Sequence, residues 1–263
     1  MPRIRTANGI AIGYDEAGVG GHTPIVFLHG VGSDKSVWHP QLDHFREDRR
    51  AVAFDYPGYG DSDAEPTGLT RDDYATTILA AMSELGIERA HVCGLSLGGV
   101  IAIAMHAAWP KRIASLILAD TFADHPDGRA IYDRSIAASG NMRALAENRV
   151  DALIAQPADP RVRAEVIETM SRIDPEAYRT GARAVWLADQ AERAAAIRVP
   201  TLVLCGAEDR ITPPALSNAL TRLIPGARCD LIERAGHLSN LERPDEFNTL
   251  VHAFIRGVDS RSG

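Results

Sequence analysis

The chain has 263 residues, of which 45% are hydrophobic and 24% charged, and its formal net charge at pH 7 is -7. This length is sufficient for one large α/β domain with an inserted segment. The acidic balance argues against a nucleic-acid-binding protein, which would carry a stripe of basic residues. No apolar run approaches the roughly 18 residues of a membrane span, and residues 1–18 lack the apolar stretch of a signal peptide. We therefore expect a cytoplasmic protein with neither nucleic acid nor membrane as a partner.

Strands and helices alternate along most of the sequence. The segments typical of strands are a hairpin at 2–16 and apolar runs at 25–28, 51–55, 91–93, 113–119, 200–206 and 229–233. The segments typical of helices are 70–86, 97–110, a stretch from about 213, and 240–256. This alternation predicts βαβ units, and the continuous apolar runs predict strands buried on both faces. The expected fold class is α/β, with a mostly parallel twisted sheet and helices on both of its faces.

The three cysteines are consistent with a reducing compartment. Cys93, Cys205 and Cys229 lie in predicted strands and form neither a CxxC pair nor an even set. We expect them to be reduced, buried thiols.

Residues 123–196 interrupt the alternation of strands and helices. They are rich in Arg, Ala, Asp and Glu, contain no strand pattern, and repeat apolar residues at helical spacing, at Val162, Val166, Met170 and Ile173. Because they lie between two predicted strands, we predict a helical lid inserted into a core domain made of residues 1–122 and 197–263. The alternative is a peripheral helical decoration without a role at the site.

The segment HVCGLSLGGVIAIAMHAAWP, residues 91–110, changes from an apolar strand to an apolar helix at a serine flanked by glycines. Reactive groups of an open α/β sheet lie beyond the carboxyl ends of its strands, and Ser96 is at such an end. A G-x-S-x-G turn between strand and helix holds the serine in a strained conformation with its hydroxyl exposed. A glycine turn with an incidental serine is the alternative, but the strand before and the helix after favour a nucleophile.

A nucleophilic serine needs a base, and the base needs a carboxylate that orients it. His237 lies between the last predicted strand and the last helix, and therefore at the same edge of the sheet. Asp209 follows the strand 200–206 directly, and Asp120, at the end of the preceding strand, is its rival. We favour Asp209 as the orienting acid. The chain order serine, acid, histidine is the one expected for such a site. Capping and turn formation are the alternative roles for both carboxylates.

Two backbone N–H groups are predicted to stabilise the oxyanion of an acyl transfer. His29 and Gly30 turn the chain after the strand 25–28, so the Val31 N–H can face the Leu97 N–H at the start of the next helix. His29 is expected to brace this loop by hydrogen bonds.

No cofactor and no metal are expected. Gly58 and Gly60 belong to a turn rather than to a GxGxxG nucleotide loop, and neither of the two lysines, Lys35 and Lys111, follows a phosphate-binding loop. The sequence contains no HExxH motif and no cluster of Cys and His with metal-ligand spacing.

Five segments occur in one order along nearly the whole chain: HGVGSD, DYPGYGDS, GLSLGG, GAEDRITPP and AGHLSNLERP. Together they resemble the α/β-hydrolase fold family. The resemblance implies Ser96 as the nucleophile, His237 as general base and then acid, and Asp209 as the acid that orients it. Val31 and Leu97 would supply the oxyanion N–H groups. A serine at this position separates the chain from the dehalogenases and epoxide hydrolases of this fold, which use aspartate.

Within the family, LGIERAHVCGLSLGG and AGHLSNLERPDEFN look most like the 3-oxoadipate enol-lactonases, which cleave a small lactone bearing a free carboxylate. The chain departs from them in the loop at His29, which reads His-Gly-Val-Gly where they usually read Asn-Ser-Leu-Gly. It also departs in the lid, where Gly181, Ala182 and Trp186 replace a cysteine pair and an arginine. The resemblance therefore implies the triad and not the substrate.

A second resemblance is to the carbon–carbon bond hydrolases that cut meta-cleavage products of aromatic rings. Trp38 and Trp186 would be walls of the substrate pocket in either case, with packing in the core as the alternative role. Residues 123–196 hold 10 Arg against 12 Asp and Glu, so the sequence indicates no particular arginine for a substrate carboxylate.

The expected function is cofactor-free hydrolysis of a small carboxylic ester or lactone through an acyl-enzyme. Carbon–carbon bond hydrolysis is the first alternative. A dioxygenase, lyase or perhydrolase without cofactor is the second, and a non-catalytic binding protein on the same fold is the third. The sequence does not indicate an oligomeric state.

Overall fold

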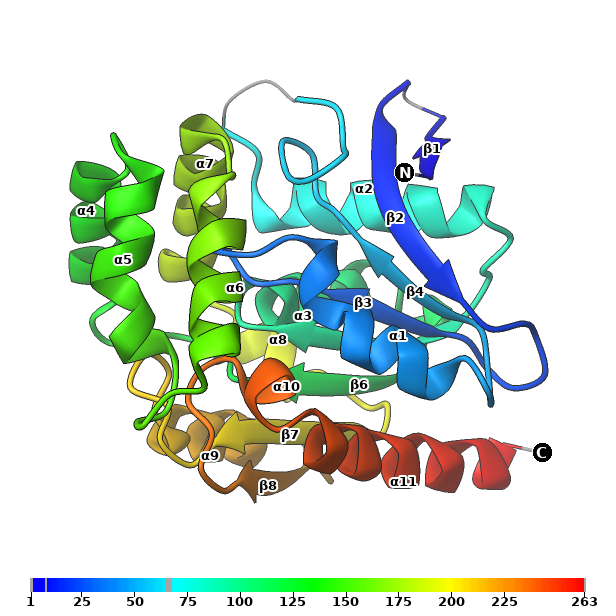
Figure 1. The fold of residues 1–263 in the computed structure, drawn as a ribbon. Coiled ribbons are helices and arrows are strands. Elements are labelled where there is room, and N and C mark those ends of the chain that lie inside the picture. The colour runs from blue at the N-terminus through cyan, green and yellow to red at the C-terminus, as the bar shows by residue number, and fades with distance from the viewer. Residues whose placement is uncertain (1, 8, 65–67, 263) are drawn as a thin grey trace.

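A mostly parallel sheet runs through the molecule (Figure 1), which is described by a computed structural model over residues 2–7, 9–64 and 68–262. The strands in this described part are β1 (Arg3–Arg5), β2 (Ala11–Ala17), β3 (Ile25–Leu28), β4 (Ala51–Phe54), β5 (Ala90–Leu95), β6 (Ile113–Ala119), β7 (Thr201–Gly206) and β8 (Arg228–Ile232). Their order in the sheet is β1-β2-β4-β3-β5-β6-β7-β8. Strand β2 is antiparallel to β1 and β4, and the pairings from β4 to β8 are parallel. The predicted sheet and its N-terminal hairpin are confirmed.

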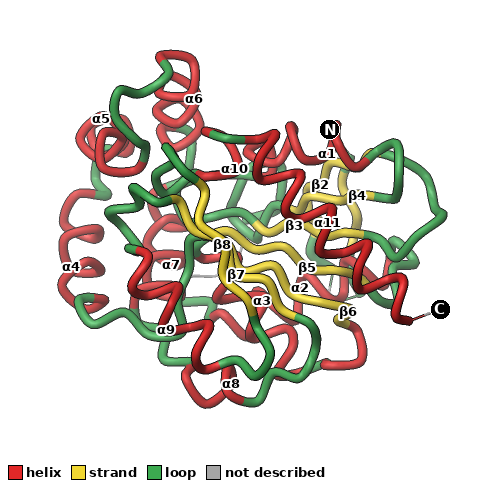
Figure 2. The backbone as a smooth tube through the Cα atoms, turned by 90° about the horizontal axis from the view of Figure 1, so that it is seen from below, coloured by secondary structure: helices red, strands yellow, loops and turns green. Residues whose placement is uncertain are grey.

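Helices cover both faces of this sheet. The helices outside the insertion are α1 (His39–Phe45), α2 (Arg71–Glu84), α3 (Leu97–Ala108), α9 (Pro214–Leu223), α10 (Ser239–Glu242) and α11 (Pro244–Ser262). Helix α1 packs against α11, and α2 packs against α3. Figures 1 and 2 show these two pairs on opposite sides of the strands. Every residue of β3 to β7 is buried, because both faces are covered, and this explains their continuous apolar sequences.

Local sequence signals set several helix boundaries. The helix expected at 70–86 begins with a capping box of Thr70 and Asp73, in which each side chain is bonded to the other residue's backbone N–H. The helix expected at 240–256 is instead divided at Pro244, which begins α11. Proline has no N–H to donate, so it is tolerated in a first helical turn and not in the interior of a longer helix.

The insertion between β6 and β7 is helical. Its helices are α4 (Gly128–Ala138), α5 (Met142–Leu153), α6 (Pro160–Ser171), α7 (Pro175–Trp186) and α8 (Ala191–Ala195). Figure 1 shows α4 to α7 grouped at one side of the sheet. Helix α8 packs instead on α3 and α9, so the C-terminal end of the insertion covers the sheet rather than the site. The working of α4–α7 as a lid, and the division of the chain into core and lid, remain predictions.

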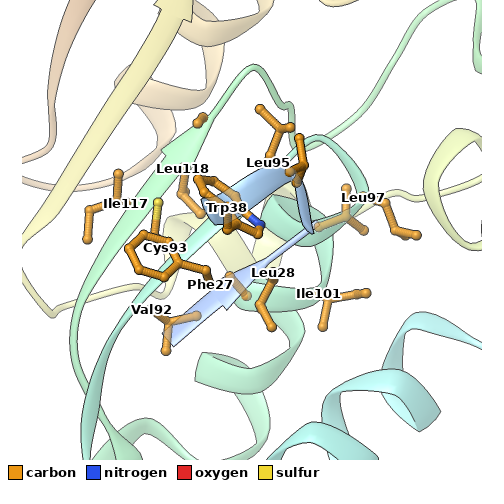
Figure 3. Close-up of a cluster of buried hydrophobic side chains, with 14 of the residues drawn as sticks. Phe27, Leu28, Trp38, Val92, Cys93, Leu95, Leu97, Ile101, Ile117 and Leu118 are labelled. Carbon is orange, nitrogen blue, oxygen red and sulfur yellow. The ribbon is translucent and has the colours of Figure 1, made fainter. Parts of the chain in front are cut away.

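Trp38 lies in the hydrophobic core. The prediction that it forms a pocket wall is wrong, because the 3₁₀ turn that contains it packs the indole inward against the sheet. The Trp38 ring centroid is 4.9 Å from that of Phe27 and 6.0 Å from that of Phe247. Figure 3 shows Trp38 among the side chains of the central strands, including Cys93 and Leu118.

Two other structural features bear on the sequence predictions. Cys93 and Cys205 are buried and Cys229 is half-buried, and none of the three forms a disulfide.

Within the described residues, none of the helices combines the length and the apolar composition required to cross a bilayer.

Candidate active site

Ser96 lies at the sharp turn between β5 and α3. Its φ of 55° and ψ of -114° place it in the left-handed half of conformational space, where a residue with a Cβ is strained by about 1–3 kcal/mol. A Cβ on Gly94 would lie 2.2 Å from the Gly98 carbonyl oxygen, and a Cβ on Gly98 would lie 2.1 Å from the Leu28 carbonyl oxygen. Only glycine fits at these two positions, so the G-x-S-x-G spacing is required by the turn.

Two hydrogen bonds from the neighbouring strand end hold the strained serine. The Ser96 N–H donates to the Ala119 carbonyl over 2.9 Å, and the Thr121 hydroxyl donates to the Ser96 carbonyl over 2.8 Å. Because the backbone is fixed on both sides, the Ser96 hydroxyl is presented to the pocket at the carboxyl edge of the sheet.

His237 and Asp209 form a buried pair. His237 Nδ1 is 2.9 Å from Asp209 Oδ2, and the backbone N–H of His237 donates to the Leu153 carbonyl at the end of α5. Three donors orient the carboxylate: the backbone N–H groups of Ile211 and Thr212 on Oδ1, at 2.7 and 2.9 Å, and the Thr212 hydroxyl on Oδ2, at 2.7 Å. Sequence reasoning missed Thr212, although its place three residues after Asp209 is typical of a side chain that supports an Asx turn.

The two charges of this pair stabilise each other. Burial lowers the pKa of His237, but the charge of Asp209 and its hydrogen bond outweigh burial, so the pKa is raised above the ordinary 6.5. Burial alone would raise the pKa of Asp209. The charge of His237 and the hydrogen bonds to the carboxylate outweigh burial, so the pKa of Asp209 is lowered below its ordinary value. His237 with its Nδ1 bonded in this way can present Nε2 as a base.

Asp120, the rival carboxylate, lies nearby but makes no hydrogen bond to His237. It accepts hydrogen bonds from the Gly206 N–H, over 2.8 Å, and from the Ser239 hydroxyl. Burial and the charge of Asp209 raise the pKa of Asp120 to about 8, against the opposing effects of His237 and Ser239. Asp120 is therefore largely protonated at neutral pH, and Asp209 occupies the position of an orienting acid.

One group in the described part of the chain, Asp120, Cys205 and Asp209, has ligand atoms close enough to hold a metal ion. Both carboxylates already accept the hydrogen bonds described above. The Cys205 thiol is buried and lies 3.3 Å from the Gly206 carbonyl oxygen, and burial raises the pKa of this thiol, which opposes the thiolate that a metal needs.

The loop after β3 brings the predicted oxyanion donors to the serine. A Cβ on Gly30 would lie 3.4 Å from Ser96 Cβ, so the loop passes directly beside the nucleophile. The N–H groups of Val31 and Leu97 donate no hydrogen bond to any residue that the structure describes, and both remain available to an oxyanion. Tyr59 fixes this loop by donating to the Val31 carbonyl over 3.3 Å.

His29 braces the same loop, as expected. Its Nδ1 lies 2.8 Å from the Gly30 carbonyl oxygen, and its own carbonyl accepts from the Tyr56 hydroxyl over 3.0 Å.

The pocket above Ser96 lies between the strand ends and the insertion. Ser96, His237 and the loop after β3 form its floor. On the side of the insertion it is lined by Arg149, Leu153, Val166, Met170, Tyr178 and Trp186. Trp186 is at the wall where it was predicted, with its ring stacked on Phe122 at a centroid distance of 5.8 Å. The free volume is about 30 Å³, which is room for one or two water molecules.

A second Ser-His-Asp set, formed by Ser115, His91 and Asp259, lies away from any pocket that reaches its serine hydroxyl. His91 Nδ1 lies 2.7 Å from the Ser115 hydroxyl, and His91 Nε2 lies 3.1 Å from an Asp259 carboxylate oxygen. His91 and Ser115 are fully buried under α11, where no substrate can reach the hydroxyl. Burial lowers the pKa of His91 to about 4, although Asp259 acts in the opposite direction, so the imidazole is neutral and holds α11 on the sheet.

Comparison with known proteins identifies relatives of this chain and of its fold. The sequence matches the alpha/beta hydrolase family over residues 25–250. It is 28% identical over 238 residues to 3-oxoadipate enol-lactonase 1 of Acinetobacter baylyi, covering 89% of each chain. It is also 28% identical over 263 residues to a putative carbamate hydrolase of Azorhizobium caulinodans, covering 91% of this chain and 94% of that relative. The crystal structure of the enol-lactonase from Burkholderia xenovorans LB400 has a TM-score of 0.90 and 29% identity, over 97% of this chain and 100% of that one.

The sheet order, the serine turn and the pocket at the carboxyl edge define an α/β-hydrolase architecture. With the family match across most of its length, the chain belongs to the alpha/beta hydrolase family. The predicted resemblance to this family and to enol-lactonases is confirmed.

Proposed function

We propose that this hydrolase cleaves a small carboxylic ester or lactone through an acyl-enzyme, without a cofactor. The observation that carries the proposal is the oriented His237–Asp209 pair at the same pocket as the strained Ser96. Similarity to two enol-lactonases supports a lactone as the substrate, and the apolar lid wall fits a small organic acyl group.

The proposed reaction uses the described groups in order. Ser96 Oγ attacks the carbonyl carbon while its proton passes to His237 Nε2, and the oxyanion accepts hydrogen bonds from the Val31 and Leu97 N–H groups. His237 then donates this proton to the leaving oxygen as the C–O bond breaks. Water, deprotonated by His237, attacks the acyl carbon, and collapse of the second intermediate releases the acid and restores Ser96. Losing one oxyanion donor typically costs on the order of 3–4 kcal/mol in such a transition state.

Labelling by a fluorophosphonate tests the nucleophile directly. We expect the intact mass of the wild-type protein to increase by one phosphonyl group and that of the Ser96→Ala variant to remain unchanged, because the probe reacts with a serine activated by a neighbouring base. Ser33→Ala is the matched control, since Ser33 lines the same pocket, and it should be labelled like the wild type. Unlabelled wild-type protein that also leaves every ester intact would contradict the proposal and favour a binding protein.

A substrate panel tests the scissile bond. Lactones and p-nitrophenyl esters should be hydrolysed with higher kcat/KM than aryl carbamates and vinylogous meta-cleavage diketones. Faster cleavage of the carbamates or diketones would replace the ester proposal by that chemistry, and oxygen uptake without hydrolysis would indicate a dioxygenase.

The pH profile of kcat/KM should report His237. Only neutral His237 accepts the serine proton, and its pKa is raised above 6.5 by Asp209. We therefore expect kcat/KM for an uncharged ester to fall as the pH drops, with a midpoint above 6.5, measured from pH 5 to pH 9. A profile that stays flat from about pH 5 to about pH 8 would exclude His237 as the base.

A further inference from the structure

Glu242, which none of the mechanistic steps above uses, lies beside the loop that carries His237. It is the last residue of α10, and its two carboxylate oxygens bond to different segments of the chain. Oε1 accepts from the Gly236 N–H over 2.8 Å, and Oε2 accepts from the Ala155 N–H over 2.7 Å. One side chain therefore joins the residue before the proposed base to the segment that follows α5.

The same two segments also touch each other directly. The His237 N–H donates to the Leu153 carbonyl over 2.8 Å. A Cβ on Gly236 would lie 2.9 Å from both the Leu153 carbonyl oxygen and the Ala155 nitrogen, so the two backbones are in close contact at this glycine. Leu153 also lines the catalytic pocket. The position of a pocket wall and the position of the proposed base are therefore set at one junction.

Helix α10, which carries Glu242, is bonded to the core. The Ser239 hydroxyl donates to Asp120, and the Asn240 amide donates to the Val37 carbonyl over 2.9 Å. Ser239 and Asn240 are fully buried. Because α10 is held from the core side, the Glu242 carboxylate restrains the loop between β8 and α10 rather than following it.

Glu242 also acts on His237 through its charge. Burial raises the pKa of the Glu242 carboxyl, although the hydrogen bonds from Ala155 and Gly236 and the charge of His237 act in the opposite direction. The attraction between two opposite charges is mutual, so an ionised Glu242 also stabilises the protonated form of His237. An uncharged side chain at position 242 should therefore lower the pKa of His237.

We infer that Glu242 is a positioning residue, whose carboxylate holds the loop of His237 against the end of α5 and so fixes the base relative to Ser96. The inference rests on the proposed function and adds a residue that acts through His237 without lining the catalytic pocket. A carboxylate suits this role because it accepts hydrogen bonds on both oxygens, and its two acceptors here serve two separate backbone N–H groups.

Two variants separate the reach of this side chain from its charge. Glu242→Gln keeps the length, but it replaces one accepting oxygen by an NH2 group and removes the charge. Glu242→Asp keeps the charge, but it is shorter by one methylene and should not span both N–H groups. We expect kcat for p-nitrophenyl valerate to fall on the order of 10- to 100-fold in both variants, with KM within about threefold, because a displaced base impairs the chemical step.

The pH profile should distinguish the two variants. Because only glutamine removes the negative charge beside the imidazole, the midpoint of kcat/KM should move downward in Glu242→Gln and much less in Glu242→Asp. The matched control is Glu246→Gln, which removes the same charge from α11, where Glu246 pairs with Arg243 over 3.8 Å at the surface. Its kcat should stay within about twofold of the wild type and its midpoint should not move, since exposed charges are screened.

The low-field proton resonance of His237 Nδ1–H, assigned by its loss in Asp209→Asn, gives a readout that needs no turnover. In an NMR titration of the free proteins, the protonation of His237 should occur at lower pH in Glu242→Gln than in the wild type, and at the wild-type pH in Glu246→Gln. The free energy of unfolding in urea, measured for the same proteins, shows how far each substitution affects the fold.

A purely structural role would give a different pattern. If Glu242→Gln loses stability but keeps the kcat, pH midpoint and His237 titration of the wild type, the inference is wrong and the proposed function stands. If Glu242→Gln does not fold, wild-type kcat in Glu242→Asp would equally overturn the inference. If the wild type neither cleaves the ester nor is labelled at Ser96, yet His237 titrates at lower pH in Glu242→Gln alone, Glu242 positions the histidine and the proposed function fails.

Discussion

Replacement of Ser96 by alanine is expected to lower kcat for ester hydrolysis on the order of 10⁶-fold, with little change in KM. The loss is this large because Ser96 supplies the attacking oxygen. Alanine leaves no hydroxyl at the turn between β5 and α3 for the His237–Asp209 pair to activate. What remains should be the slow, direct attack of water stabilised by the oxyanion donors alone. The measurement is kcat and KM with p-nitrophenyl valerate, together with the free energy of unfolding in urea.

The free energy of unfolding of Ser96→Ala distinguishes a catalytic defect from a folding defect. Serine and alanine both carry a Cβ, so both bear the strain of the positive φ at position 96. Ser96→Ala should therefore change the free energy of unfolding only modestly. Ser33→Ala is the control for removal of a pocket hydroxyl, and its kcat should stay within about tenfold of the wild type. Retention of wild-type kcat in Ser96→Ala would mean that the reaction uses no serine nucleophile.

The parts that the sequence predicts well depend on local signals. The serine turn is recognisable because the backbone geometry requires glycine at Gly94 and Gly98, and clashes within a few residues enforce this requirement. His237 and Asp209 are recognisable because each lies in the loop after a strand, and parallel strands all end at one edge. Chain order and strand position alone do not separate Asp209 from Asp120, which also follows a strand, and only the hydrogen bond to His237 Nδ1 distinguishes them.

The parts that the sequence does not predict depend on packing between distant segments. Trp38 and Trp186 are both plausible pocket residues, and only the tertiary structure shows that the first packs on Phe27 and the second faces the site. Two arginines present the same difficulty. Arg134 in the insertion and Arg210 in the loop after β7 are distant in sequence, and the cavity that both line becomes visible only when α4 is placed beside that loop.

Asp209→Asn should lower kcat about 10⁴-fold, the size of effect seen when a triad acid is made neutral. Asparagine keeps an oxygen for the Ile211 and Thr212 N–H groups, so the loop should remain folded. Its amide nitrogen, however, takes the place of the oxygen that faces His237 Nδ1, and it donates where the carboxylate accepts. The imidazole is then forced to carry its proton on Nε2, where it cannot receive the proton of Ser96. Loss of the negative charge should also move the midpoint of the residual pH profile downward, because that charge raises the pKa of His237.

Asp120→Asn is the matched comparison, since it removes the other buried carboxylate of the same site. Its pKa of about 8 leaves Asp120 mostly neutral at pH 7, so a neutral amide of the same shape should change kcat by less than about fivefold there. The amide oxygen can still accept from the Gly206 N–H, and asparagine tolerates the positive φ of 48°. If Asp120→Asn were the more damaging of the two, Asp120 would be the acid that supports the base. The hydrogen bond between Asp209 and His237 would then have a structural role, in the same way that His91 and Asp259 hold α11 on the sheet.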